Sequence, residues 1–228
     1  MLYEEWQPAY RAILDEFGYE AAGDERARDV LTGLLADERP LGLGDLELSG
    51  TVAVCGAAAS LEDELGVARE ADSVVAASTA ADVLREHGIA VDCMVTDLDK
   101  NPETVRELTA LGTPVAVHAH GDNIAAVESQ VPGLEAGAVL PTTQAEPCDP
   151  VVNPGGFTDG DRAAFLADAC GAEELVFAGW AFDDPTVGAE KRRKLAWAER
   201  LLRWLERRRG EQFGVLDGRR DDVELPWV

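Results

Sequence analysis

Asp97 and Asp99 directly follow an apolar run of the sequence that ends at Thr96. If the backbone remains extended there, side chains two residues apart lie on the same side of it. Two carboxylates on one side of a strand end offer the hard oxygen ligands that Mg²⁺ prefers. The alternative is a solvated turn, in which Asp99 or Asn101 caps the following helix. Other polar residues along the chain favour the metal-binding interpretation.

A second polar group, formed by His118, His120 and Asp122, ends another apolar run. Its H-x-H-x-D spacing is typical of dinuclear metallohydrolases, but zinc sites of that kind need further histidine ligands downstream. The one other histidine, His87, lies upstream, so this interpretation fails. We therefore expect Asp122 to reach the same metal as the two aspartates above, with capping of a helix as the alternative.

Several residue types in the chain are suited to a phosphorylated or heterocyclic ligand. The small residues from Gly56 to Ser60 let backbone N–H groups approach a phosphate, although a tight turn explains them almost as well. Thr143 and Gln144 can hydrogen-bond ribose or the edge of a heterocycle, and such residues also fill ordinary loops.

Residues 153–162 form a glycine-rich segment that runs into a predicted helix. Gly155 and Gly156 permit close approach of the backbone to a ligand, and Phe157 can lie against an aromatic ring. The alternative is a helix cap formed by Thr158 and Asp161, which leaves the two glycines unexplained.

Lys191 and Lys194 lie at the start of the last helical segment, 187–209. Cations near a helix N-terminus oppose the helix dipole by about 0.3–1 kcal/mol each. Either acidic neighbours such as Asp183 or a bound polyphosphate must compensate them. Because the apolar stripe of the helix extends back to both lysines, we expect them to face the sheet and favour the polyphosphate.

The charge of the chain limits its partners. Its 228 residues include 44 Asp and Glu against 20 Lys and Arg, which gives a net charge of −24. Such a surface disfavours nucleic acid, whose binding needs dense Lys and Arg. An acid-rich, lysine-poor chain suits a salt-rich cytosol, where the Debye length is about 3 Å at molar salt, so we expect a cytoplasmic protein of a halophile. An acidic protein from a dilute cytoplasm is the alternative. The sequence predicts no membrane span and no signal peptide.

Short apolar runs alternate with helical patterns, which predicts an α/β fold. We expect a mostly parallel sheet of about six strands with helices on both faces, and ligands outside the carboxyl ends of the strands. A helical segment at 1–45, with helices at 4–17 and 22–36, precedes an α/β catalytic domain at 46–228. The predicted strands are 51–55, 73–77, 92–96, 114–118, 136–141 and 174–179, and the helices between and after them are 60–70, 79–87, 101–111, 121–129, 159–169 and 187–209. A further strand is expected near 213–216 in the tail.

In their order along the chain, five polar motifs resemble those of the archaeal MptE-like 6-hydroxymethyl-7,8-dihydropterin pyrophosphokinases. The motifs are residues 96–99, 118–123, 142–144, 155–162 and 191–195, and the resemblance covers roughly residues 50–205. The resemblance implies transfer of diphosphate from ATP to the hydroxymethyl group of a reduced pterin, with Mg²⁺ and with release of AMP, in folate or methanopterin synthesis. It also implies a fold similar to that of thiamine pyrophosphokinases. The chain departs from the family pattern at Ala181, where an acidic residue is expected, and at Ser78-Thr79. Altered substrate contacts, or a replacement by Asp183, are both open.

The site residues follow from the patterns and the resemblance together. We expect phosphate chemistry from Asp97, Asp99, Asp122, Lys191 and Lys194, the three aspartates being the Mg²⁺ ligands. The expected substrate-binding residues are Gly56, Ser60, His118, His120, Asn123, Thr143, Gln144, Asn153, Gly155, Gly156, Phe157, Asp159, Asp161 and Arg162. Two alternatives remain. One is a thiamine pyrophosphokinase-like enzyme, which would transfer diphosphate to a different acceptor, and the other is a non-catalytic nucleotide-binding regulator. The sequence leaves homo-oligomer formation open.

Overall fold

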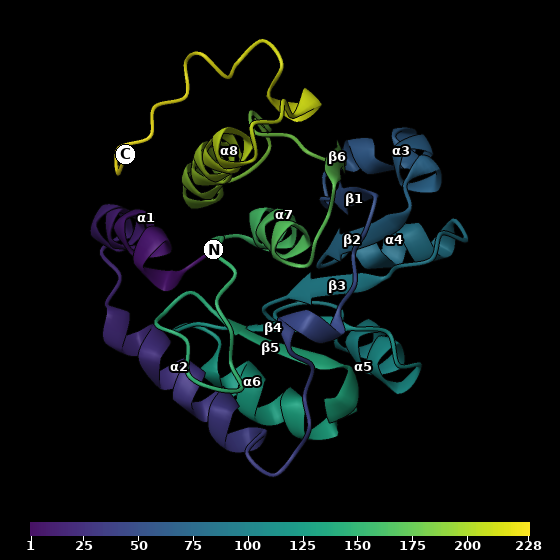
Figure 1. Cartoon of the computed structure of the whole chain (residues 1–228), viewed down its shortest axis with the longest axis vertical. Coiled ribbons are helices and arrows are strands. Elements are labelled where there is room, and N and C mark those ends of the chain that lie inside the picture. Colours follow the sequence, from purple (N-terminus) through teal and green to yellow (C-terminus); the bar gives the residue numbers. More distant parts are fainter.

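The computed structural model describes all residues from 1 to 228 and has one six-stranded sheet with helices on both faces (Figure 1). Every neighbouring pair of strands is parallel, and the strand order is β5-β4-β3-β2-β1-β6. The predicted fold class is therefore confirmed, with a sheet that is wholly parallel. The strands are β1 (Thr51–Cys55), β2 (Ser73–Ala77), β3 (Cys93–Thr96), β4 (Val115–Ala119), β5 (Val139–Thr143) and β6 (Glu174–Ala178).

Alternating side chains along each strand supply two hydrophobic cores, one on each face of the sheet. Val52 and Val54 of β1 point into the first core, whereas Ala53 and Cys55 point into the second. Helices α1 (Tyr3–Phe17), α7 (Asp159–Ala169) and α8 (Ala189–Arg209) pack into the first core. The second core is covered by α2 (Ala21–Leu34), α3 (Leu65–Glu70), α4 (Ala80–Glu86), α5 (Pro102–Ala110) and α6 (Ile124–Gln130).

The two N-terminal helices pack directly onto the remainder of the chain. Trp6 of α1 is buried and stacks on Trp204 of α8, with ring centroids 6.3 Å apart. Leu31 of α2 is buried in the second core. The turn between the two helices, residues 18–20, lies at the carboxyl edge of the sheet. The boundary predicted between 1–45 and 46–228 stays a prediction.

Two local expectations are wrong. The helix expected at 60–70 is divided into a 3₁₀ helix, Ala59–Asp63, and α3. The strand expected near 213–216 is a 3₁₀ helix, Gly214–Leu216. Its flanking residue Phe213 is fully buried, with its ring 4.9 Å from that of Phe177, so these apolar residues belong to a core contact and not to the sheet.

The remaining tail turns back along α8, where the chain end lies near α1 (Figure 1). Trp227 stacks on Trp197 at 5.2 Å and meets Trp204 edge to face at 5.7 Å. None of the helices combines the length and the apolar composition that crossing a bilayer requires.

Candidate active site

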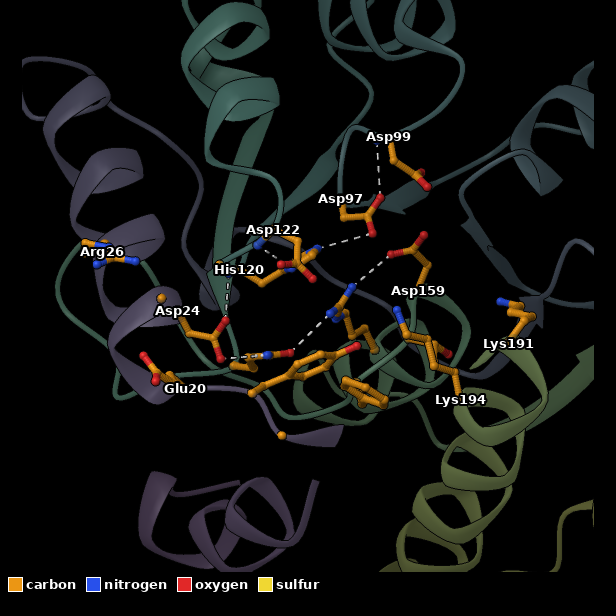
Figure 2. A pocket seen from close by; sticks show the side chains of 18 of the residues that line it. Glu20, Asp24, Arg26, Asp97, Asp99, His120, Asp122, Asp159, Lys191 and Lys194 are labelled. Carbon is orange, nitrogen blue, oxygen red and sulfur yellow. Dashed lines mark hydrogen bonds and ion pairs between the residues drawn. The ribbon is translucent and has the colours of Figure 1, made fainter. Parts of the chain in front are cut away.

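The carboxyl ends of β3, β4 and β5 open into a cavity of about 640 Å³, which we call the polar cavity (Figure 2). Charged and polar side chains from six parts of the chain line it: the start of α2, the loops after β3, β4 and β5, the start of α7 and the start of α8. Because parallel strands end at the same edge of the sheet, residues far apart in sequence meet there.

Three carboxylates lie together in the polar cavity. Asp97 and Asp99 follow β3, Asp159 begins α7, and one oxygen from each lies within 4.8 Å of the others. The backbone between the first two is not extended as the sequence suggested, because Leu98 adopts the left-handed conformation (φ 64°) and buries its side chain in the second core. The resulting tight turn still brings both carboxylates to the same side, and the N–H of Asp99 donates to Asp97 at 3.3 Å.

The three carboxylates differ in their affinity for protons. Burial, followed by the nearby charge of Asp97, raises the pKa of Asp159 to about 7. Burial and the hydrogen bond to Asp97 also raise the pKa of Asp99. Burial alone would raise the pKa of Asp97, but its contacts with His120, 3.5 Å away, and Asp99 lower it. The group thus holds more negative charge than its protein neighbours neutralise.

Asp122, predicted as the third metal ligand, is not part of this group. It is exposed on the wall of the polar cavity, where its backbone N–H donates to Nδ1 of His120 at 3.4 Å. Asp159 takes the third position, because the N-terminal end of α7 lies opposite the end of β3. The structure therefore groups Asp159, and not the predicted Asp122, with Asp97 and Asp99.

A chain of hydrogen bonds connects the carboxylate group to the N-terminal helices. Arg162 donates to Asp159 at 3.1 Å and to the amide oxygen of Gln144 at 3.3 Å. The Gln144 amide nitrogen donates to Asp24 of α2 at 2.8 Å, and Tyr10 of α1 donates to the same carboxylate oxygen at 2.7 Å. Burial, together with Asp24, raises the pKa of Tyr10, so its hydroxyl remains protonated and a donor. Figure 2 shows the part of this chain between Asp159 and Asp24, which crosses the polar cavity.

Lysines also line the polar cavity. Lys191 and Lys194 project from the start of α8, as the amphipathic pattern predicted (Figure 2). Lys194 pairs with Glu190 at 3.3 Å, whereas Lys191 makes no ion pair. Lys100, next to the carboxylates, lies 3.7 Å from Asp99. The polar cavity therefore contains both a group of carboxylates and three lysines, two from α8 and one beside the carboxylates.

Several predicted substrate contacts are instead internal to the protein at the end of β4. His118 is buried, with Nδ1 3.0 Å from the hydroxyl of Thr142, and burial and the nearby charge of Arg162 lower its pKa well below the usual value. Asn123 donates to the backbone oxygens of Asp97 and His118, both at 2.7 Å. It therefore ties the turn after β3 to the end of β4 and positions Asp97.

Two glycines of the loop before α7, predicted to contact substrate, also have their close contacts within the protein. Gly155 and Gly156 adopt positive φ angles of 102° and 98°, and neither lines the polar cavity. A Cβ at Gly156 would lie 2.6 Å from the Cα of Arg162, so this glycine admits helix α7 and not a ligand. Both glycines thus have close neighbours within the protein, and the approach of a ligand to them stays a prediction.

Asp161, Asn153 and Thr143 also have internal partners. Asp161 is fully buried and accepts from the N–H groups of Phe157 and Thr158, so the capping alternative is correct. The Asn153 amide donates to the oxygen of Ala145 at 2.7 Å. Thr143 accepts from the N–H of that same residue at 3.2 Å. None of these three lines the polar cavity, whereas the predicted residues Phe157, His120, Gln144 and Arg162 do.

Sequence reasoning missed the contribution of α2 and of Lys100. Tyr19, Glu20, Asp24 and Arg26 all line the polar cavity. Nothing in a chain so rich in acidic residues distinguishes Asp24. Lys100, in contrast, is one of only three lysines and directly follows Asp99, which could have identified it.

A second cavity of about 280 Å³ lies beside the first, at the ends of β1, β2 and β6. Gly56 lines it, whereas Ser60 does not. Both departures from the family pattern, Ala181 and the Ser78-Thr79 turn, are in its wall. Asp183, the suggested replacement for an acidic residue at 181, pairs with Arg219 at 2.6 Å and lines neither the polar nor the second cavity.

A parallel α/β sheet with grouped carboxylates and facing lysines at its carboxyl edge is typical of enzymes that act on phosphorylated ligands. More narrowly, the chain belongs to the family described as 6-hydroxymethylpterin diphosphokinase MptE-like, whose model matches residues 42–186. The recognised resemblance is thus confirmed. The family match leaves out residues 18–26 and both lysines of α8, which also line the polar cavity.

Individual relatives cover nearly the whole chain. A 6-hydroxymethyl-7,8-dihydropterin pyrophosphokinase from Methanothermobacter thermautotrophicus is 38% identical over 220 residues, which cover 89% of this chain and 94% of the relative. The protein of the same name from Pyrococcus furiosus is 38% identical and covers 90% and 95%. That from Methanocaldococcus jannaschii is 29% identical and covers 89% and 95%.

Proposed function

We propose that this protein is a 6-hydroxymethyl-7,8-dihydropterin pyrophosphokinase that transfers diphosphate from ATP to the pterin. The oxygen of the pterin hydroxymethyl group bonds to the β-phosphorus and its proton is released to solvent. The bond from this phosphorus to the α–β bridging oxygen breaks, and AMP leaves with that oxygen. Family membership and the names of three relatives support the reaction. The observation that carries it to specific residues is the group of three carboxylates facing lysines.

The carboxylate group fits a divalent cation. Asp97, Asp99 and Asp159 offer hard oxygen donors within 4.8 Å of one another, the ligand type that Mg²⁺ prefers. Burial, and after it the negative charge of Asp97, raise the pKa of Asp159 to about 7, and a bound cation would favour the ionised form of this carboxyl group. Mg²⁺ held by these residues would supply charge neutralisation on the phosphates of ATP.

The other polar residues then have distinct tasks. Lys191 and Lys194 from α8, and Lys100 from beside the carboxylates, neutralise phosphate charge, which stabilises a transition state whose charge spreads over phosphate oxygens. Arg162, held between Asp159 and Gln144, fixes the position of the metal-binding carboxylate. Catalysis of this type depends on positioning and charge neutralisation more than on proton transfer.

We place the reduced pterin on the α2 side of the polar cavity. Its ring edge carries several hydrogen-bond donors and acceptors, and this side provides polar groups such as Gln144 and Glu20. Tyr19 and Phe157 line the same cavity and offer aromatic surface to a flat ring. With its net charge of −24, the protein is expected to act in the cytoplasm on small molecules and not on nucleic acid.

The decisive experiment measures AMP formed by the purified protein from ATP and Mg²⁺ in molar KCl, with and without 6-hydroxymethyl-7,8-dihydropterin. We expect AMP only with the pterin, and none when thiamine replaces it. Asp97→Asn should lower kcat by at least about 10²-fold without unfolding the protein, because it removes a metal-binding charge. Nucleotide binding without AMP formation would contradict the proposed reaction, and near-normal kcat in the variant would contradict the role of Asp97.

A further inference from the structure

The second cavity is built from small residues and one large ring. Gly56 follows β1, Ala77 ends β2 and Ala181 follows β6, so most of the wall is formed by backbone and methyl groups. Trp180 also lines it, and its orientation is fixed because its indole N–H donates to the oxygen of Val54 at 3.0 Å. These features suit a flat, largely apolar group.

Four charged side chains line the second cavity, and only one of them, Asp184, does not also line the polar cavity. Lys100, Asp159 and Lys191 line both the second cavity and the polar cavity, so they mark the junction between the two. A ligand that fits both cavities therefore has a flat apolar end, in the second cavity, and an anionic end that reaches the lysines and carboxylates. A nucleoside polyphosphate has this polarity, whereas an unreacted hydroxymethylpterin has no anionic end.

The topology of the sheet supports a ligand at this position. The chain progresses from β1 through β5 in one direction and then returns to place β6 on the other side of β1. In open parallel sheets, ligands bind outside the carboxyl ends of the strands where the direction of winding changes. Here that point lies between β1 and β6, where the N–H of Ala58 donates to the oxygen of Gly179 at 3.0 Å. The rim of the second cavity is thus held in place without a ligand.

Ser78 provides an independent indication of a ligand. It is only 5% exposed, lines the second cavity and adopts a left-handed conformation with φ 52°. Its hydroxyl has no hydrogen-bond partner within the protein. Backbone strain and an unpaired buried hydroxyl both cost stability, and they occur together where a ligand supplies the missing partner.

We infer that the second cavity binds the adenine and ribose of the phosphate donor, with the Ser78 hydroxyl as a hydrogen-bond partner of the nucleoside. This inference rests on the proposed function, because it assigns one of its two substrates to a place. A volume of about 280 Å³ is at the lower end for ligand sites, so it accommodates a nucleoside and leaves the triphosphate to the junction. The pterin remains in the polar cavity.

The test places a larger side chain in the second cavity and measures the affinity for each ligand separately. Binding of α,β-methylene-ATP with Mg²⁺, and of 6-hydroxymethyl-7,8-dihydropterin, is measured by calorimetry on the full chain. We expect Ala181→Leu to lower the affinity for the nucleotide analogue by about tenfold or more, because the added carbons occupy the space of the nucleoside. Binding of the pterin, and of inorganic triphosphate, which lacks a base, should change by less than about twofold.

A matched control and a gentler variant accompany this test. Ala110→Leu adds the same side chain at an exposed position at the end of α5, which lines neither cavity, and should leave both affinities unchanged. Ser78→Ala removes only the hydroxyl and should weaken the analogue by about three- to tenfold, the usual effect of one hydrogen bond. This second variant decides the question if Ala181→Leu does not fold.

Three results would overturn the inference: weaker pterin binding with unchanged analogue binding, equal weakening of both ligands, and no change in any affinity. Failure of the proposed function appears in a different measurement. If the wild-type protein forms no AMP from ATP and the pterin, but Ala181→Leu still weakens the analogue, the nucleoside site stands and the reaction does not.

Discussion

The two neighbouring cavities at the carboxyl edge of the sheet are built in different ways. Charged side chains form the polar cavity, and they hold one another in place through a chain of hydrogen bonds from Tyr10 to Asp159. The second cavity is shaped mainly by backbone and small residues, and its one buried hydroxyl, that of Ser78, has no partner. The first is arranged around charge and the second around shape.

This difference separates the consequences of substitutions. A change of charge at constant volume should affect mainly the polar cavity, where electrostatic stabilisation of the transferred phosphates is concentrated. A change of volume at constant charge should affect mainly the second cavity. Lys191, like Lys100 and Asp159, lines both, and the two cavities should interact through these residues.

The largest expected effect concerns the carboxylates. Asp159→Asn should lower kcat by about 10²- to 10³-fold, because it removes one of three charges that lie within 4.8 Å of one another. Asp122→Asn makes the same chemical change on the exposed wall of the polar cavity and should cost less than about tenfold. Steady-state assays of AMP formation at several Mg²⁺ concentrations measure both, and only Asp159→Asn should raise the Mg²⁺ requirement. The reverse order of the two variants would restore Asp122 as the third ligand.

The next effect concerns the backbone that supports the polar cavity. Gly156→Ala should lower the free energy of unfolding by about 3 kcal/mol or more, because its φ is 98° and its Cβ would lie 2.6 Å from the Cα of Arg162. Gly171 has almost the same φ, 99°, but open space around it, so Gly171→Ala should cost only about 1 kcal/mol. Urea unfolding gives both values. Equal losses would mean that the contact with α7 contributes nothing beyond backbone strain.

The sequence predicted those parts of the molecule whose signals are local. Alternation of apolar runs and helical patterns identified all six strands, since parallel strands buried on both faces are apolar throughout. The same rule predicted the edge for ligands. Unusual residues at a strand end indicated Asp97 and Asp99, and cations at a helix start indicated the two lysines of α8. The amphipathic stripe of α8 also indicated the direction in which those lysines point.

The parts that could not be predicted depend on contacts between distant segments. Asp122 and Asp159 are both aspartates near helix starts, and only the position of α7 relative to β3 decides that Asp159 joins the group of carboxylates. Gly155 and Gly156 look alike whether a ligand or a helix approaches them. A wall of small residues such as that of the second cavity cannot be distinguished, in sequence, from ordinary tight packing.

A smaller effect should separate the two lysines of α8. Lys191→Met should raise the KM for ATP by about tenfold, because this lysine makes no ion pair and lines both cavities. Lys194 is paired with Glu190 at 3.3 Å and lines only the polar cavity, so Lys194→Met should raise the same KM by about threefold. Kinetics at fixed ionic strength test this order. An equal effect of the two variants would contradict a phosphate path that runs through the junction.

The smallest effect concerns the far end of the hydrogen-bond chain. Tyr10→Phe removes the donor 2.7 Å from Asp24 and should lower the free energy of unfolding by about 1–2 kcal/mol, because a buried carboxylate loses a partner. Tyr19→Phe removes an exposed hydroxyl 3.5 Å from Glu190 and should cost less than about 0.5 kcal/mol. If Asp24 positions Gln144 for the pterin, Tyr10→Phe should also raise the KM for the pterin and leave that for ATP unchanged. A rise in both KM values would mean that the chain supports the whole carboxyl edge and not the polar cavity alone.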